Sequence, residues 1–267
     1  MSKIIGICNQ KGGTGKTTTA VNLTTFLALA GKKTLLVDVD PQGNATSGLG
    51  KEVSSELPSI YQGLIEKEPP QKLIVSTSWK NLFLIPSSIS LTGAEIELVS
   101  LEERESRLRR LLEMIRYDFE YIILDAPPSL GLLTVNVLVA ADSLIIPIQC
   151  EYYALEGVSK LLNTIELVKE RLNPRLEIEG VLLTMADFRT RLALQVIEEV
   201  KRFFKEKVFT TIIPRNVKLA EAPSFGKPIL FYDPSCVGTK AYLNLTQEIL
   251  KRKIDLDLCG SSLKEGG

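Results

Sequence analysis

The chain contains no histidine. Acid–base catalysis by histidine, catalytic triads that contain histidine and histidine metal sites are therefore excluded within this sequence. The four cysteines are far apart and form no Cys-x-x-Cys pair; they are Cys8, Cys150, Cys236 and Cys259. Reduced thiols are the expectation, and an iron–sulfur cluster shared across a dimer is the alternative.

Long apolar runs are also missing. No stretch of eighteen consecutive apolar residues occurs, so we expect no membrane-spanning helix. The N-terminus enters an apolar strand pattern without a basic segment followed by an apolar one, so we expect no secretion signal. Apolar residues nevertheless make up 45% of the 267 residues, which is enough for the core of a single α/β domain.

Net charge is zero, but the charges are unevenly distributed. Residues 1–185 carry 18 Lys and Arg against 22 Asp and Glu, a net charge of −4. Residues 186–267 carry 14 against 10, a net charge of +4. A basic surface on the last third of the chain is therefore possible on a neutral protein.

A strand, a glycine-rich turn and a helix follow one another at the start of the chain. Residues 3–9 form a short apolar run, and residues 16–30 repeat apolar side chains at helical spacing up to Gly31. The turn between them reads Lys11-Gly12-Gly13-Thr14-Gly15-Lys16-Thr17-Thr18. Glycines let backbone N–H groups approach phosphate oxygens closely, and this context is typical of a phosphate-binding loop.

Two side chains in this loop complete a nucleoside triphosphate site. Lys16 would reach the β- and γ-phosphates, and the Thr17 hydroxyl would bind Mg²⁺. The usual loop has a glycine five residues before Gly15, but this sequence has Gln10 there and a second lysine, Lys11, next to it. Lys11 is either a solvated surface charge or part of the nucleotide site.

Carboxylates end two of the predicted strands. Residues 34–40 end in Asp38 and Asp40, and the apolar run 121–125 ends in Asp125. Side chains at the carboxyl ends of parallel strands face the ligand crevice of a doubly wound sheet. We therefore expect Asp125 to hold Mg²⁺, with a helix N-cap as the alternative. For Asp38 and Asp40, the alternative to a role at the ligand is that one of the two merely caps a turn.

The remaining periodicity predicts an α/β fold with one doubly wound, mostly parallel sheet flanked by helices. Further strands are predicted at residues 81–86, 143–149, 178–184 and 208–213, and helices at 102–116, 155–171 and 236–253. We expect one P-loop ATPase domain over residues 1–253 and a flexible tail over 254–267.

These motifs resemble the ParA/Soj branch of the deviant-Walker ATPases over nearly the whole chain. The resemblance is carried by Lys11 with its glycine loop, by the runs 38–44 (Asp-Val-Asp-Pro-Gln-Gly-Asn) and 125–128 (Asp-Ala-Pro-Pro), and by the block from Pro214-Arg215 to Pro228. A run resembling the family's Thr-x-x-Asp-x-Arg-Thr motif covers residues 184–190.

The resemblance implies specific roles for these residues. Lys11 would cross a dimer interface to the nucleotide of the other subunit, and Asp40 would position or activate the attacking water. Asp38 would support the loop and the Mg²⁺ shell. Pro214 and its neighbours would line the adenine pocket. Arg189 would contact DNA phosphates without reading bases, and Lys218 would extend that surface.

The activity implied is slow ATP hydrolysis with Mg²⁺ that times DNA segregation. An ATP-bound homodimer would bind double-stranded DNA non-specifically, and a ParB-type centromere-binding protein would stimulate hydrolysis and release. The protein would be cytoplasmic and associated with the nucleoid, without a membrane partner.

Three other functions remain open. A MinD-like positioning ATPase would share the loop but end in a basic amphipathic helix, whereas residues 254–260 carry two acids. A reductase would need paired cysteines, and a tyrosine kinase would need a tyrosine-rich tail. The MinD-like ATPase is the main alternative.

Overall fold

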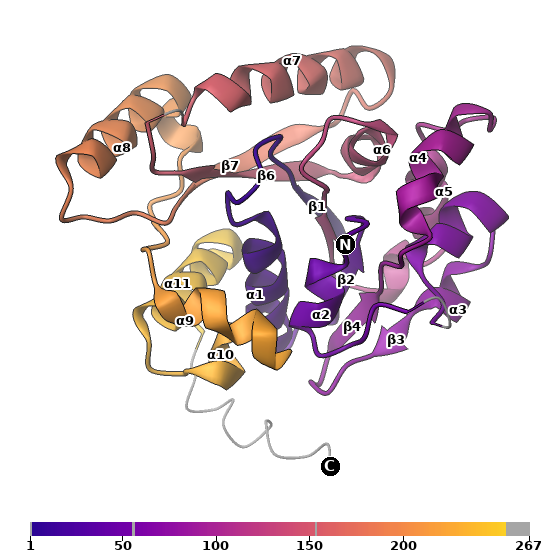
Figure 1. Cartoon of the computed structure of the whole chain (residues 1–267), viewed down its shortest axis with the longest axis horizontal. Coiled ribbons are helices and arrows are strands. Elements are labelled where there is room, and N and C mark those ends of the chain that lie inside the picture. Colours follow the sequence, from indigo (N-terminus) through magenta and orange to yellow (C-terminus); the bar gives the residue numbers. More distant parts are fainter. Residues whose placement is uncertain (1, 55–56, 153, 255–267) are drawn as a thin grey trace.

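A seven-stranded sheet runs through the molecule in the order β3-β4-β2-β5-β1-β6-β7 (Figure 1). The computed structural model describes residues 2–54, 57–152 and 154–254. The strands are β1 (Lys3–Ile7), β2 (Thr34–Asp38), β3 (Val75–Ser76), β4 (Leu82–Ile85), β5 (Tyr121–Asp125), β6 (Ser143–Gln149) and β7 (Glu177–Thr184). Only β3, at one edge, pairs antiparallel to its neighbour. The predicted doubly wound, mostly parallel sheet is confirmed.

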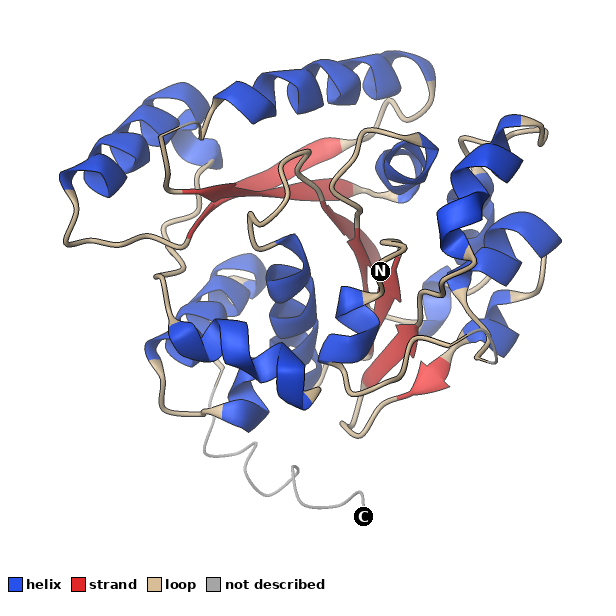
Figure 2. Ribbon diagram, viewed as in Figure 1, coloured by secondary structure: helices blue, strands red, loops and turns tan. Residues whose placement is uncertain are grey.

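Helices cover both faces of this sheet (Figure 2). The α-helices are α1 (Lys16–Leu29), α2 (Asn44–Gly48), α3 (Pro70–Leu73), α4 (Leu91–Val99), α5 (Arg107–Glu113), α6 (Leu132–Ala140), α7 (Glu156–Arg171), α8 (Arg191–Phe204), α9 (Val217–Glu221), α10 (Ile229–Tyr232) and α11 (Val237–Leu250). Short helical turns lie at η1 (Gln62–Glu66), η2 (Arg116–Asp118), η3 (Lys205–Lys207) and η4 (Ala222–Phe225).

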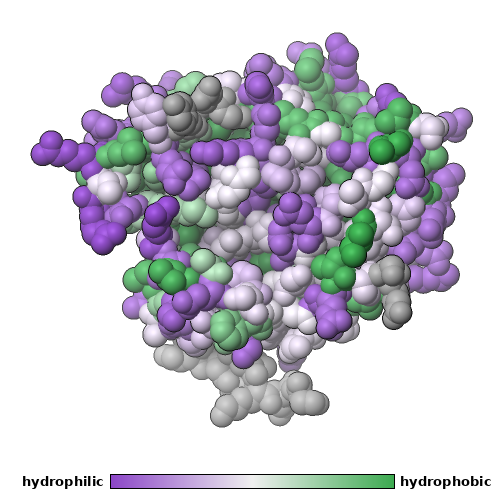
Figure 3. Space-filling view, in the orientation of Figure 1, coloured by the Kyte–Doolittle hydropathy of each residue, from purple (hydrophilic) through white to green (hydrophobic). Residues whose placement is uncertain are grey.

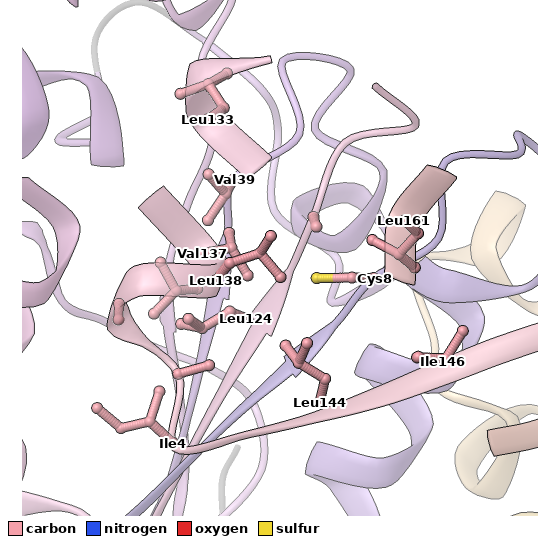
Figure 4. Close-up of a cluster of buried hydrophobic side chains, with 14 of the residues drawn as sticks. Ile4, Cys8, Val39, Leu124, Leu133, Val137, Leu138, Leu144, Ile146 and Leu161 are labelled. Atoms are coloured by element: carbon pink, nitrogen blue, oxygen red, sulfur yellow. The ribbon is translucent and has the colours of Figure 1, made fainter. Parts of the chain in front are cut away.

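Alternate residues of each strand enter two separate cores. In β1, Ile4 packs with α4, α5, α6, α7 and α8, and Ile5 packs with α1, α10 and α11 on the other face. Figure 4 shows the first core, which includes Leu124 of β5 and Leu144 of β6, the strands on either side of β1, together with Val137 of α6. Because both faces are covered, the parallel strands are apolar almost throughout, as is typical of such sheets.

Two predicted elements differ from the structure. The helix predicted over residues 102–116 begins only at Arg107, because Glu103 has a φ of +53°, which a helix cannot accommodate. A separate helix, α4, precedes it. No helix was predicted at α4, α6 or α8.

The strand predicted over residues 208–213 is wrong. Among the described residues this segment forms no strand; it has an isolated bridge from Val208 to Val181 of β7, and a second bridge joins Pro214 to Ala186 just beyond both. The reason is the local competition for its N–H groups: the amides of Thr210 and Thr211 donate to the Glu248 carboxylate of α11, at 2.7 and 3.0 Å. The predicted tail lies outside the described residues from position 255 onward.

The carboxyl ends of the central strands meet at one edge of the sheet. In the register of the ladder, Asp125 of β5 lies opposite both Ile7 of β1 and Asp38 of β2. The glycine-rich loop follows β1 at this same edge, as the chain order requires. Within the described ranges, no helix is long and apolar enough to cross a bilayer.

Candidate nucleotide-binding site

The loop between β1 and α1 forms a cradle of backbone donors. Gly13 and Gly15 have φ values of +71° and +85°, in the left-handed region that glycine adopts without strain. Within the described part of the chain, the N–H groups from Gly12 to Thr18 have no hydrogen-bond acceptor. Together with the positive end of the α1 dipole, these donors form an anion site suited to phosphate.

The loop is held in shape by contacts with two strands, β6 and β7. The Asn9 side chain donates to Pro147 O of β6 at 2.6 Å and accepts from Lys11 N at 3.0 Å. The Thr184 hydroxyl at the end of β7 donates to Thr14 O at 2.8 Å. The cradle is therefore preformed, which reduces the ordering cost of binding an anion.

Lys16 lies within this cradle and is almost completely buried. Its ammonium donates to Lys11 O at 3.1 Å. Burial lowers the pKa of Lys16, and the negative charge of Asp125 partly offsets the shift. A phosphate would supply the negative charge that this buried cation lacks.

Asp125 is fully buried at the end of β5, and neither carboxylate oxygen has a hydrogen-bond partner among the described residues. Desolvation raises the pKa of Asp125 well above its usual value, and the charge of Asp38 raises it further. The Thr17 hydroxyl lies beside it and opposes the shift. A buried carboxylate without donors, next to a hydroxyl, fits a divalent cation.

Asp38 is engaged differently. Its Oδ2 accepts from both the backbone N and the hydroxyl of Thr46 at 2.7 Å, and its Oδ1 accepts from Asp40 N at 3.2 Å. Burial raises the pKa of Asp38 to about 6, and these hydrogen bonds oppose the shift. The geometry favours a loop-supporting role over direct metal binding.

Asp40 is 5% exposed and lines the cavity in front of the loop. Its Oδ1 accepts from Gln42 N at 3.0 Å.

This cavity measures about 630 Å³ and is lined on one side by the glycine loop and on the other by α9, η4 and the segment to Ile229. In the orientation of Figure 1, pale surface of intermediate hydropathy occupies much of the centre of the molecule, and both hydrophilic and hydrophobic side chains lie around it (Figure 3).

Two features of this cavity were not predicted. Asn22 of α1 accepts from Ile229 N at 2.8 Å and so fixes the far wall. The wall itself includes Ala222, Pro223 and Pro228, which belong to the sequence block 214–228 that carried the family resemblance. Pro214, at the start of that block, instead lines a second groove. The role of Pro214 in the adenine pocket stays a prediction that the cavity lining does not support.

The described residues fit Mg²⁺ bound together with phosphates. They contain no group of three or more His, Cys, Asp and Glu side chains that could enclose a metal alone. Mg²⁺ keeps waters and takes one or two carboxylates plus substrate phosphates, and Asp125 with Thr17 offers that donor set.

The two candidate DNA-binding residues lie outside the nucleotide cavity. Arg189 precedes α8, its side chain is 88% exposed, and its guanidinium forms a bidentate pair with Asp187 at 2.7 and 2.8 Å. Lys218 lies on α9 and pairs with Glu221 at 3.0 Å. Beside the Arg189 loop lies a groove of about 920 Å³ lined by Phe188, Pro214, Lys240, Lys251, Arg252 and Lys253, among others.

Comparison with known proteins places this geometry in a family. A family model described as an AAA domain matches residues 2–178. The sporulation initiation inhibitor protein Soj of Bacillus subtilis is 58% identical over 93% of this chain and 98% of its own length. The chromosome partitioning protein ParA of Myxococcus xanthus is 55% identical over 94% of this chain and 89% of its own length.

A solved structure shares the fold over almost the same extent. Cobyrinic acid a,c-diamide synthase from Mycobacterium smegmatis, with a bound ATP analogue and magnesium, has a TM-score of 0.84 and 36% identity, covering 94% of this chain and 95% of that one. That enzyme is named for a different reaction, and its identity is well below that of the two partitioning proteins. With the family model, the near-complete coverage and the glycine loop in agreement, the chain belongs to the ParA/Soj family of chromosome partitioning ATPases.

Proposed function

We propose that this protein is an ATP-dependent switch for DNA segregation. The observation that carries the proposal is the meeting of three groups at one edge of the sheet: the free N–H cradle from Gly12 to Thr18, the buried Lys16, and the carboxylate of Asp125, which lies beside Thr17. This combination suits the phosphates of ATP and Mg²⁺. Bound Mg²⁺ would neutralise phosphate charge during transfer.

Lys11 is the residue that would connect two subunits. Its carbonyl is used within the loop, where it accepts from Lys16 Nζ at 3.1 Å. Its side chain is only half-buried, and the proposal assigns its ammonium to a second copy of the chain. In this proposal, ATP closes a homodimer in which each Lys11 contacts the nucleotide of its partner.

Asp40 would control the hydrolysis step. Its carboxylate lines the nucleotide cavity, and one oxygen is oriented by Gln42 N. Oriented this way, it could hold an attacking water in line with the terminal phosphate. Because the site offers positioning and electrostatic stabilisation and no histidine base, we expect slow turnover by the protein alone.

The ATP-bound dimer would bind double-stranded DNA through phosphates. Arg189 projects into solvent, and the nearby groove has four cations along its lining, Lys240, Lys251, Arg252 and Lys253. Among the described residues that line it, the acid is Glu248, whose carboxylate accepts from two backbone amides. Such a surface supports salt-dependent, sequence-independent binding.

A ParB-type partner would stimulate hydrolysis and release the dimer from DNA. ATP then acts as a timer, because only the dimeric state has high affinity for DNA. The location that follows is the cytoplasm, in association with the nucleoid.

The test is binding to random-sequence duplex DNA at low and moderate salt, with ATP, with ADP and without nucleotide. Sedimentation with anionic liposomes runs in parallel. The proposal expects DNA binding that requires ATP, falls steeply with salt and occurs without lipid binding. Lipid binding without DNA binding would refute it and support a MinD-like function.

A further inference from the structure

A second network of buried hydrogen bonds surrounds Asp40 on the side away from the phosphate loop. Ser87 lies two residues beyond the end of β4 and is 1% exposed. Its hydroxyl donates to Asp40 O at 2.7 Å, and its backbone N donates to the Thr46 hydroxyl at 3.0 Å. A residue of the neighbouring strand thus reaches the loop that carries Asp40.

Thr46 of α2 closes this network. It is fully buried, and both its N–H and its hydroxyl donate to Asp38 Oδ2 at 2.7 Å. Asp38 Oδ1 accepts from Asp40 N at 3.2 Å. The hydrogen bonds therefore form a closed ring that runs from Asp40 to Ser87, Thr46, Asp38 and back to Asp40.

The ring fixes the backbone of Asp40 at both ends. Its N–H is held by Asp38, and its carbonyl is held by Ser87 and by Gly43 N at 2.9 Å. The side chain is then free to vary only by rotation, and Gln42 N restrains that rotation through Oδ1. A carboxylate held this firmly can direct one oxygen into the cavity.

The anchor of the ring is the sheet itself. β2 and β4 are paired in parallel register, with Val37 opposite Ile85, so Asp38 and Ser87 leave neighbouring strands at the same edge. Neither Ser87 nor Thr46 is among the residues that line the nucleotide cavity. Any effect of these two hydroxyls on hydrolysis must therefore pass through the residues they hold, which are Asp40 for Ser87 and Asp38, the acceptor of the Asp40 amide, for Thr46.

We propose that Ser87 and Thr46 are positioning residues for the hydrolysis step, and that they act by holding the Asp40 loop in the geometry that orients the attacking water. This inference rests on the role of Asp40 in the proposed function. It predicts that removal of either hydroxyl slows the chemical step and leaves ATP binding intact.

A matched pair of variants tests Ser87. In Ser87→Ala the carbonyl of Asp40 keeps only Gly43 N. The control is Ser88→Ala, since Ser88 is equally buried and its hydroxyl accepts from Ser59 Oγ at 3.0 Å and does not reach the Asp40 loop. We expect Ser87→Ala to lower kcat for phosphate release from radiolabelled ATP about ten- to hundredfold, with KM within about twofold, and Ser88→Ala to leave kcat within about twofold.

A second pair tests Thr46 independently. Thr46→Val keeps the side-chain shape but removes the hydroxyl, whereas Thr46→Ser keeps the hydroxyl. We expect the valine variant to lose kcat as Ser87→Ala does, and the serine variant to restore it to within about threefold of the parent. A merely structural role would instead lower the melting temperatures of Ser87→Ala and Thr46→Val without separating the kcat values within either pair.

Asp40→Ala, measured beside these variants, distinguishes a failure of the proposed role of Asp40 from a failure of the positioning inference. If Asp40→Ala hydrolyses ATP at the parent rate, the proposed role of Asp40 fails. If Asp40→Ala is inactive but Ser87→Ala matches Ser88→Ala and Thr46→Val matches Thr46→Ser, the positioning inference is overturned and the proposed function stands.

Discussion

The contact between Asn22 and Ile229 predicts that one buried amide supports both stability and nucleotide binding. Asn22 is 4% exposed; its Oδ1 accepts from Ile229 N at 2.8 Å and its Nδ2 donates to Thr18 O at 2.8 Å. Asn22→Ala removes both hydrogen bonds and leaves the Ile229 N–H buried without an acceptor. An unpaired buried donor costs about 1–3 kcal/mol.

The expected loss in unfolding free energy is therefore about 2 kcal/mol, which lowers the melting temperature by about 4–8 °C in a chain of this size. Nucleotide affinity should fall as well, because Ile229 is part of the cavity wall. Thermal melting with and without MgATP, together with titration of a fluorescent ATP analogue, measures both quantities.

The control is Asn44→Ala, which removes an exposed asparagine from the lining of the same cavity. It should change the free energy of unfolding by less than about 0.5 kcal/mol. The reasoning is refuted if the melting temperature of Asn22→Ala lies within about 1 °C of the parent value. It is also refuted if Asn44→Ala is destabilised to the same extent as Asn22→Ala.

Four further outcomes are expected. Lys16→Ala should abolish MgATP-induced thermal stabilisation, because the loop loses its buried cation; unchanged stabilisation would contradict the site. Arg189→Ala should weaken ATP-dependent DNA binding and make it less dependent on salt, while ATP affinity is unchanged. The control is Arg171→Ala, which removes another exposed arginine. An equal fall in ATP affinity would make Arg189 a nucleotide-site residue. Gly180→Ala should destabilise the fold by about 1–3 kcal/mol in denaturant melts, since its Cβ would lie 2.5 Å from the Phe209 ring. Burial raises the pKa of Cys8 to about 12 and of Cys150 to about 11, so peptide mapping after iodoacetamide treatment at pH 8 should find both thiols unmodified until the protein is unfolded.

The parts of the site that sequence reasoning anticipated are those encoded by neighbouring residues. The glycine loop and Lys16 are recognisable because strand, turn and helix follow each other directly in the chain. Asp125 is recognisable because it ends an apolar run. Their meeting at one edge follows from the parallel arrangement, since strands of a doubly wound sheet all end on the same side.

The parts that were missed depend on contacts between distant residues. Ser87 reaches Asp40 across 47 positions, and Asn22 reaches Ile229 across 207. Nothing in the local pattern of either residue distinguishes it from an ordinary buried polar side chain. The strand predicted at 208–213 was wrong for the same reason, because Glu248, which takes its amides, lies on a helix about 37 residues later.

The irregular segment beside β7 also affects how this protein behaves in concentrated solution. β7 is the last strand on its side of the sheet, and an uncovered parallel edge would offer a row of amides to a strand from another chain. Segment 208–214 covers that edge, and Glu248 accepts from the amides of Thr210 and Thr211 within it. The segment is thus a barrier against irreversible edge-to-edge aggregation of the folded protein.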